Sequence, residues 1–323
     1  MELFKYKKPI GLMDASKRFG ILSILLVLLS WGLLMTKGFN YGIDFAGGTL
    51  IQVKYESDAP IRKIRTELKK EKLYASANVT YFGSNQEVVI RIKSSSESVD
   101  KDIGAEIRSL LKDTGKLEVR RVDIVGASIG QEFRNKGLTA MLLAILGILI
   151  YISLRFEWRF AVASVMALIH DVSIAIGAIV LMNIEVNLDI LAALLTLLGY
   201  SLNDTIIVFD RIREGIRKIK DPDLAGIINE SVTRTLSRTV LTSLTTFFVV
   251  LSLYLFGGEI ISGFSFTLLV GVVVGTYSSI FVASPILLWL GFDVRGFRAK
   301  EAEKLKREKE KEKMRAQYEQ GTL

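Results

Sequence analysis

The chain has 323 residues, half of them hydrophobic, and its mean hydropathy of +0.36 is rare among soluble domains, which indicates a membrane protein. It contains no cysteine and a single histidine, His170, so disulfides, thiol catalysis and a multi-histidine metal site are excluded. The net charge of +8 fits nucleic-acid binding only if the cations gather in one patch, and their positions argue against that.

Six apolar stretches are long enough to cross a bilayer, which takes about 20 helical residues. We predict spans at 19–36, 138–154, 160–182, 190–209, 240–256 and 264–290. The first span follows a basic N-terminus, as in a signal peptide, but Lys37-Gly38-Phe39 comes after it where a cleavage site would have small residues. We therefore expect an uncleaved anchor.

Lysine and arginine occur in alternate connections, which fixes the expected orientation. They are abundant in residues 1–18, after the second and fourth spans, and in the tail 292–323, whereas the connections "NIEVNLD" and "GGEIISG" have none. We expect both termini in the cytoplasm, residues 37–137 outside, and the five later spans within 138–291. The charge is thus a topology signal, and we expect no nucleic-acid partner. The tail mixes both charges at helical spacing, typical of a solvated helix or one drawn to anionic lipid.

The outer segment, residues 37–137, has the order strand, helix, strand, strand, helix, strand. Apolar and polar residues alternate in Gly48–Glu56, and each helix has one apolar face, with Pro60 starting the first and Ser98 able to cap the second. A turn at Gly83–Asn85 separates the middle strands. This βαββαβ order predicts a periplasmic ferredoxin-like α+β domain. It has no evident catalytic pair, so we expect it to bind or to move.

The stretch "YGIDFAGGT" joins the first span to this domain. Its glycines Gly42, Gly47 and Gly48 permit backbone angles that other residues avoid. It lacks the lysine of a phosphate-binding loop and precedes no predicted helix. Two interpretations stay open: a tight connector, or a hinge in which Asp44 sets the orientation of the domain.

The fourth span, within "LLGYSLNDTIIVFDRIRE", contains Asn203 and Asp204. A carboxylate in hydrocarbon costs about 2.5–3.5 kcal/mol on insertion scales, so Asp204 is expected to face the bundle interior and to have partners. The fifth span runs the opposite way, which predicts a pocket that Asp204 and Asn203 share with Arg238 and with the hydroxyls of Thr242, Ser243, Thr245 and Thr246. Alternatively, Asp204 only bonds neighbouring helices together.

The third span carries His170 and Asp171, which we expect roughly one helical turn deeper than Asp204. A carboxylate that loads and releases, hydroxyls that relay and a nearby cation together make a proton path. The alternatives are that Asp171 bonds helices and that His170 is a packed histidine. Asp210 lies at the cytoplasmic edge and is expected to pair with Arg213.

The sixth span has small residues at every fourth position. They are Gly263, Thr267, Gly271, Gly275, Ser279 and Ala283. Such a stripe lets another helix approach closely, and Gly271 and Gly275 form its G-x-x-x-G motif. The pattern predicts helix packing, with a sliding surface as the alternative.

Several stretches resemble the SecF family of protein-export membrane proteins, within the resistance–nodulation–division superfamily. The most specific are "GYSLNDTIIVFDRIRE", "RTLSRTVLTSLTT" and "YLFGGEIISGFSFTLLVGVVVGTYSSIFVASP", and the connector matches a pattern shared with SecD. The resemblance covers about Phe19 to Gly291. The chain departs from the family pattern at Ala127, where a proline is common, so we expect a looser turn there.

The resemblance implies a non-enzymatic subunit of the Sec translocase in the bacterial cytoplasmic membrane, with no cofactor. Such a subunit works with SecD and YajC beside the SecY/SecE/SecG channel and the SecA ATPase. It uses the proton motive force, or sodium in some relatives, to promote preprotein export. By position, Asp204 matches the family's proton-carrying aspartate and Arg238 its partner arginine. One six-span bundle, where the superfamily has two, implies a second bundle.

Two other functions remain open. One is a proton-driven exporter of a small molecule or lipid, although such pumps of this superfamily have much larger outer domains. The other is a structural scaffold, in which Asp204→Asn would leave function nearly intact.

Overall fold

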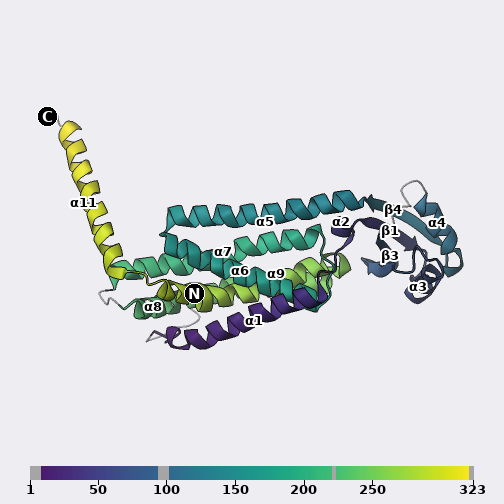
Figure 1. The fold of residues 1–323 in the computed structure, drawn as a ribbon, viewed down its shortest axis with the longest axis horizontal. Coiled ribbons are helices and arrows are strands. Elements are labelled where there is room, and N and C mark those ends of the chain that lie inside the picture. Colours follow the sequence, from purple (N-terminus) through teal and green to yellow (C-terminus); the bar gives the residue numbers. More distant parts are fainter. Residues whose placement is uncertain (1–8, 94–101, 220–222, 320–323) are drawn as a thin grey trace.

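The structure is a computed structural model that describes residues 9–93, 102–219 and 223–319. Figure 1 shows an elongated molecule, in which a bundle of long helices carries a small α+β domain at one end and helix α11 (Val294–Glu319) at the other. Six helices of the described part are long and apolar enough to cross a membrane. This number agrees with the six predicted spans.

The six spans are longer than the apolar stretches that predicted them. They are α1 (Ser16–Lys37) after the 3-10 turn η1 (Met13–Ala15), α5 (Ala127–Arg155), α6 (Trp158–Leu181), α7 (Leu188–Lys218), α8 (Leu224–Phe256), and α9 (Gly258–Ser278), which continues through η3 (Ser279–Ala283) into α10 (Ser284–Trp289). Hydropathy marks only the part of a helix that suits hydrocarbon, so the polar ends escape it. The wide turn η3 is π-helical and lies just before Pro285, whose missing N–H cannot continue the ordinary helix ladder.

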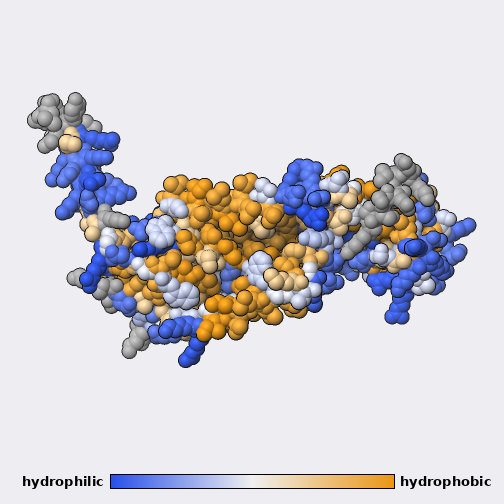
Figure 2. Space-filling view, in the orientation of Figure 1, coloured by the Kyte–Doolittle hydropathy of each residue, from blue (hydrophilic) through white to orange (hydrophobic). Residues whose placement is uncertain are grey.

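The bundle is built around α6, α7 and α9. Their inward faces supply much of one apolar core, which includes Leu168, Ile179, Leu197 and Phe209. Helices α1, α5 and α8 lie at the periphery and keep many large apolar side chains exposed. Figure 2 shows that hydrophobic residues cover most of the visible face of the bundle, with hydrophilic residues at both ends. This distribution suits a helical bundle surrounded by lipid.

The α+β domain lies between the first two spans. Its elements are β1 (Gly48–Tyr55), α3 (Ile61–Lys70), β2 (Asn78–Phe82), β3 (Ser84–Lys93), α4 (Ile103–Leu110), the 3-10 turn η2 (Lys112–Thr114) and β4 (Leu117–Val125). The sheet order is β2-β3-β1-β4, and every neighbouring pair is antiparallel. This is the ferredoxin-like arrangement that the sequence predicts.

Local details of this domain differ from the prediction. The hairpin turn is shorter than Gly83–Asn85, because β3 already begins at Ser84 and Gly83 alone has a positive φ of 71°. The second helix is capped by Asp102, whose carboxylate accepts a hydrogen bond from the N–H of Ala105 (3.1 Å). The predicted cap, Ser98, lies outside the described residues. On α4, Ile107 is fully buried, as the helical period requires.

Candidate functional site

Asp204 lies inside the bundle, on α7, with 1% of its surface exposed. Its Oδ2 accepts a hydrogen bond from Ser243 Oγ on α8 (3.0 Å), and Thr276 Oγ1 on α9 lies 2.7 Å from the same Ser243 oxygen. In the described part of the chain, no ion pair involves Asp204. A buried carboxylate with a single neutral donor is costly, which indicates a functional reason for its presence.

Asp171, on α6, is a second buried carboxylate and is fully enclosed. Its Oδ2 accepts hydrogen bonds from Ser201 Oγ on α7 (2.5 Å) and from Ser278 Oγ on α9 (2.7 Å). Its Oδ1 lies 2.8 Å from Nδ1 of His170. Asp171 is therefore much better satisfied than Asp204, and this geometry suits a residue that bonds three helices as well as one that relays protons.

His170 connects this cluster to the first span. Its ring stacks on Tyr277, with centroids 6.1 Å apart, and the Tyr277 hydroxyl donates to the carbonyl oxygen of Phe19 on α1 (2.8 Å). The second ring nitrogen of His170, Nε2, is buried and has no hydrogen-bond partner among the described residues. The histidine is thus packed, but only half of its hydrogen-bonding capacity is used.

The two acidic clusters adjoin each other through α7 and α9. Ser201 and Asp204 are three residues apart on α7, so they share a helix face and differ by only about 4.5 Å along its axis. Thr276 and Ser278 contribute to the Asp204 and Asp171 clusters from one turn of α9. Together these groups form one buried polar layer between α6, α7, α8 and α9.

Close packing of α9 on α7 makes this layer possible. A Cβ atom added to Gly275 would lie 3.1 Å from Cβ of Ser201, and one added to Gly271 would lie 2.4 Å from Leu197. The small-residue stripe of the sixth span therefore faces α7. Three residues after Gly275, Ser278 of the same helix donates a hydrogen bond to Asp171 of α6 (2.7 Å).

Among the described residues, Ser243 is the one member of the predicted pocket that bonds to Asp204, and the other five do not. Asn203, Arg238 and Thr245 are exposed, and Thr246 is only partly buried. The hydroxyls of Thr245 and Thr246 both donate to the carbonyl oxygen of Thr242 on their own helix (2.8 and 3.1 Å). Within the described residues, the guanidinium group of Arg238 forms no hydrogen bond or ion pair.

The rotation of α8 about its own axis explains why these side chains do not reach Asp204. Its inward face at this depth carries Thr239 and Ser243, which are buried, so positions 238, 242 and 245 fall on the opposite face. Helix spacing along the sequence cannot determine which face of α8 turns toward α7, so these residues could not be told apart from Ser243 in advance.

Three hydroxyl residues of the polar layer were missed from the sequence: Ser201, Thr276 and Ser278. Ser201 could have been found from its position three residues before Asp204, and the other two from "GTYSS" next to the small-residue stripe. The signal is weak, because serine and threonine in membrane helices often bond only to their own backbone, as Thr242 does here (3.0 Å to the Arg238 carbonyl).

Asp210 lies outside the polar layer. Its Oδ1 accepts a hydrogen bond from Arg213 (2.9 Å) and lies 3.6 Å from Arg155. The predicted pairing with Arg213 is therefore confirmed. No group of three or more potential metal-binding side chains occurs among the described residues.

The connector contains a one-turn helix, α2 (Ile43–Ala46), which the sequence analysis did not expect. Asp44 Oδ2 accepts a hydrogen bond from the N–H of Leu188 (3.1 Å), and the N–H of Gly42 donates to the Val186 carbonyl (2.9 Å). The connector is thus tied to the link between α6 and α7, and Asp44 lies at the first turn of α7.

Both glycines of the "GG" pair sit where a side chain would collide. A Cβ atom on Gly47 would lie 2.8 Å from the Ala127 backbone, and one on Gly48 would lie 2.3 Å from the Ile92 carbonyl oxygen. Their φ angles are 76° and 149°, which favour glycine. This packing supports a tight connector between α1, the sheet and α5.

Comparison with known proteins places this architecture in a family. Residues 106–293 match the family model described as protein export membrane protein SecD/SecF, C-terminal, and residues 32–59 match the SecD/SecF GG motif. A protein translocase subunit SecF of Helicobacter pylori (strain J99) is 47% identical over 323 residues, covering 100% of both chains. The SecF subunit of Vibrio alginolyticus is 47% identical over 90% of this chain and 92% of its own.

The crystal structure of SecDF from Thermus thermophilus, described as a translocon-associated membrane protein, has the same fold. It superposes with a TM-score of 0.78 at 34% identity over 90% of this chain. The present chain spans only 40% of that SecDF chain.

The fold and the buried acidic layer thus define a multi-pass membrane protein with one α+β domain. The chain belongs to the SecD/SecF family of protein-export membrane proteins, on the SecF side of that family.

Proposed function

We propose that this chain is an auxiliary, non-enzymatic subunit of a bacterial protein translocase, which uses the proton motive force to promote preprotein export. Relatives named protein translocase subunit SecF, at 47% identity over the full chain, support the role in export. Asp204 supports the proton coupling, because it is a buried carboxylate held by a single hydroxyl. Of the two buried carboxylates in the described bundle, Asp204 has fewer hydrogen bonds to lose than Asp171 when a proton binds or leaves.

The observation that carries the proposal is the contrast between Asp204 and Arg238. Asp204 is buried without a cation, while Arg238 is exposed, within a helix that is apolar enough to span the membrane. An exposed guanidinium at the edge of an apolar span is costly unless water or a partner covers it. Arg238, Thr242 and Thr245 lie at i, i+4 and i+7, so they form one polar stripe on α8.

A second six-span bundle, that of SecD, packs against this polar stripe of α8. The SecDF chain of Thermus thermophilus, of which this chain spans 40%, supports this arrangement. With the second bundle in place, Arg238 and Asn203 line a polar interface next to Asp204, where water and protons can reach the carboxyl group. The coupling ion is the proton, with sodium as the alternative, and no cofactor takes part.

Proton binding at Asp204 changes the hydrogen bond that Ser243 of α8 donates. Because Thr276 of α9 bonds to the same Ser243 hydroxyl, the change affects both helices. Because α9 packs closely on α7 at Gly275, a change of helix contact here shifts the polar layer as a unit. The connector ties the link between α6 and α7 to the α+β domain, so the shift reaches that domain.

The orientation follows from the positive charges: both termini are cytoplasmic and the α+β domain is periplasmic. The chain then acts in the cytoplasmic membrane after SecA has pushed a preprotein into the SecY/SecE/SecG channel. YajC is a further partner of the assembly.

Affinity purification in mild detergent tests the assembly. We expect the tagged chain to recover SecD together with channel subunits. Arg238→Glu should reduce recovery of SecD by roughly tenfold, because it reverses a charge within the interface. The matched charge reversal Arg315→Glu, in the tail helix, should leave recovery unchanged. Recovery without SecD, or equal recovery in both variants, would contradict the proposed interface.

A further inference from the structure

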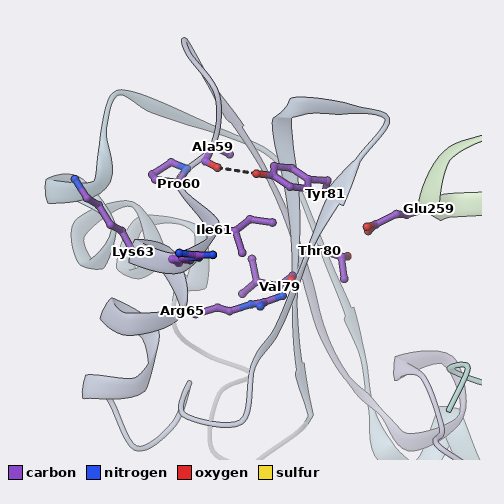
Figure 3. Close-up of a pocket in the computed structure, with 10 residues that line it drawn as sticks. Ala59, Pro60, Ile61, Lys63, Arg65, Val79, Thr80, Tyr81 and Glu259 are labelled. Atoms are coloured by element: carbon purple, nitrogen blue, oxygen red, sulfur yellow. Dashed lines mark hydrogen bonds between the residues drawn. The ribbon is translucent and has the colours of Figure 1, made fainter. Parts of the chain in front are cut away.

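A groove of about 670 Å³ lies where the α+β domain meets the bundle (Figure 3). One wall is the first turn of α3 with the residues just before it, the floor is β2, and Glu259 at the start of α9 closes the far side. None of the residues of the polar layer around Asp204 lines this groove. The function of the groove must therefore be sought separately from proton coupling.

The groove runs along the free edge of the sheet. Strand β2 is the last strand on its side of the described sheet. Val79, Thr80 and Tyr81 all line the groove, although successive side chains of a strand point to opposite faces. Figure 3 shows Val79 and Thr80 on opposite sides of the strand. Three consecutive residues can line one groove only if the groove borders the edge of the strand, where the backbone is exposed, and not one face of the sheet.

The backbone groups on this edge face the groove, and a further strand could pair with them once Arg65 leaves the Val79 carbonyl. The carbonyl oxygen of Val79 faces the groove, because it accepts a hydrogen bond from Arg65 of α3 (2.7 Å). Backbone groups of a strand alternate in direction with a period of two, so the N–H and C=O of Tyr81 face the groove as well. A free edge of this kind pairs readily with an extended chain.

The charge of the groove favours an acidic ligand. Arg62, Lys63 and Arg65 all lie on the α3 wall, and Glu259 is the acidic residue among the lining side chains. Neither Arg62 nor Lys63 forms an ion pair within the described residues. The first turn of α3 holds no acidic residue, and its N-terminus has no side-chain cap, so its field adds to that of the cations.

We propose that the β2 edge binds an extended, acidic segment of an exported polypeptide, which adds as a fifth strand beside β2. Arg65 leaves the Val79 carbonyl when the incoming backbone takes its place, and it then pairs with an acidic side chain of the ligand. The choice of an exported chain as ligand rests on the proposed function. It is supported by the position of the groove, next to Glu259 at the end of the bundle that carries the α+β domain.

Peptide binding to the purified full-length protein tests the site without a membrane potential. The probe is a fluorescent eight-residue peptide of alternating valine and glutamate, measured by anisotropy. We expect Arg62→Glu combined with Lys63→Glu to weaken binding at least about tenfold, as loss of complementary charge predicts. Lys69→Glu, at the other end of α3, should change it less than about twofold. Equal affinity in these variants would overturn the charge argument.

Backbone methylation of the peptide tests strand pairing directly. N-methyl groups on one set of alternate residues should abolish binding, because those N–H groups pair with β2, while the other set should leave it intact. Equal effects of the two sets would overturn the edge-strand geometry.

Cross-linking during export identifies the ligand. The chain has no cysteine, so Thr80→Cys gives a unique handle in the groove, and Lys69→Cys is the control. We expect an arrested export intermediate with one cysteine to cross-link at position 80 and not at 69. Cross-linking at neither position, or equally at both, would overturn the exported chain as ligand. A failure of proton coupling would instead appear in Asp204 variants, which leave peptide binding unchanged.

Discussion

At the scale of single residues, Ser243 is the side chain on which the state of Asp204 most directly depends. It is the hydrogen-bond donor to Asp204 and is itself buried, whereas the neighbouring Thr242 is exposed and bonds only to its own backbone. The two residues therefore allow a matched comparison on one helix. Comparing variants of the two residues distinguishes a hydroxyl that donates a hydrogen bond to Asp204 from one that bonds only to its own helix.

We predict that Ser243→Ala lowers the proton-driven part of export several-fold, because removing a hydrogen bond to a buried charged group costs roughly 1.5–3 kcal/mol. Thr242→Ala should leave export within about twofold of the wild type. The measurement is the rate at which a slow-folding secretory protein leaves the cytoplasm. If the two variants exported equally well, Ser243 would have no special role.

Arg238 offers a second test at this scale, because its charge and its shape can be varied separately. Lysine keeps the charge without the planar fork, and methionine keeps the length without the charge. We predict that Arg238→Lys retains most export activity and that Arg238→Met loses it. Equal loss in both variants would show that the geometry of the guanidinium matters more than its charge.

At the scale of elements, the strands and helices follow closely from the sequence pattern. Alternation in Gly48–Glu56 identified β1, and apolar faces identified α3 and α4, because burial of one face imposes these periods. Helix ends were less predictable: α5 begins at Ala127, while its apolar stretch begins at Leu138. The capping residue and the rotation of α8 depend on tertiary contacts that no local pattern records.

The same dependence on tertiary contacts explains which residues of the candidate site could be predicted from the sequence. Asp204 and Asp171 stood out because a carboxylate is costly in hydrocarbon wherever the helix faces. Ser201 and Ser278 did not, because their role depends on which carboxylate lies opposite. Arg238 was predicted to share the pocket of Asp204, but its side chain is exposed on another face of α8. Its orientation suits a partner that the isolated sequence does not contain.

The connector allows an element-scale prediction about rigidity. Gly48→Ala should destabilise the fold by more than about 2 kcal/mol, because it combines a φ of 149° with a collision against the Ile92 carbonyl oxygen. Gly83→Ala should cost less, about 1–2 kcal/mol, since its φ of 71° lies in the left-handed region and nothing lies within 4 Å of its Cβ. Thermal unfolding of the purified protein measures both. A larger loss at Gly83 would argue against a packed connector.

At the scale of the whole molecule, the function proposed above makes the chain one half of a coupling device. Among the described residues, no lysine or arginine bonds to the buried acidic layer, and the guanidinium group of Arg238 is exposed, so a second bundle would complete both. The α+β domain is tied to the same bundle through Asp44 and the "GG" pair. The proposed proton site, the proposed partner interface and the α+β domain therefore lie on one connected chain.

The most direct test is the rate of preprotein export in vesicles that contain the full translocase, with and without an imposed proton motive force. We predict that Asp204→Asn, which keeps the shape and the hydrogen bond, abolishes the stimulation by the proton motive force while assembly with SecD is retained. Asp210→Asn, on the same helix but paired with Arg213 outside the polar layer, should keep the stimulation. Normal stimulation in the Asp204→Asn protein would contradict the claim that this residue carries the proton.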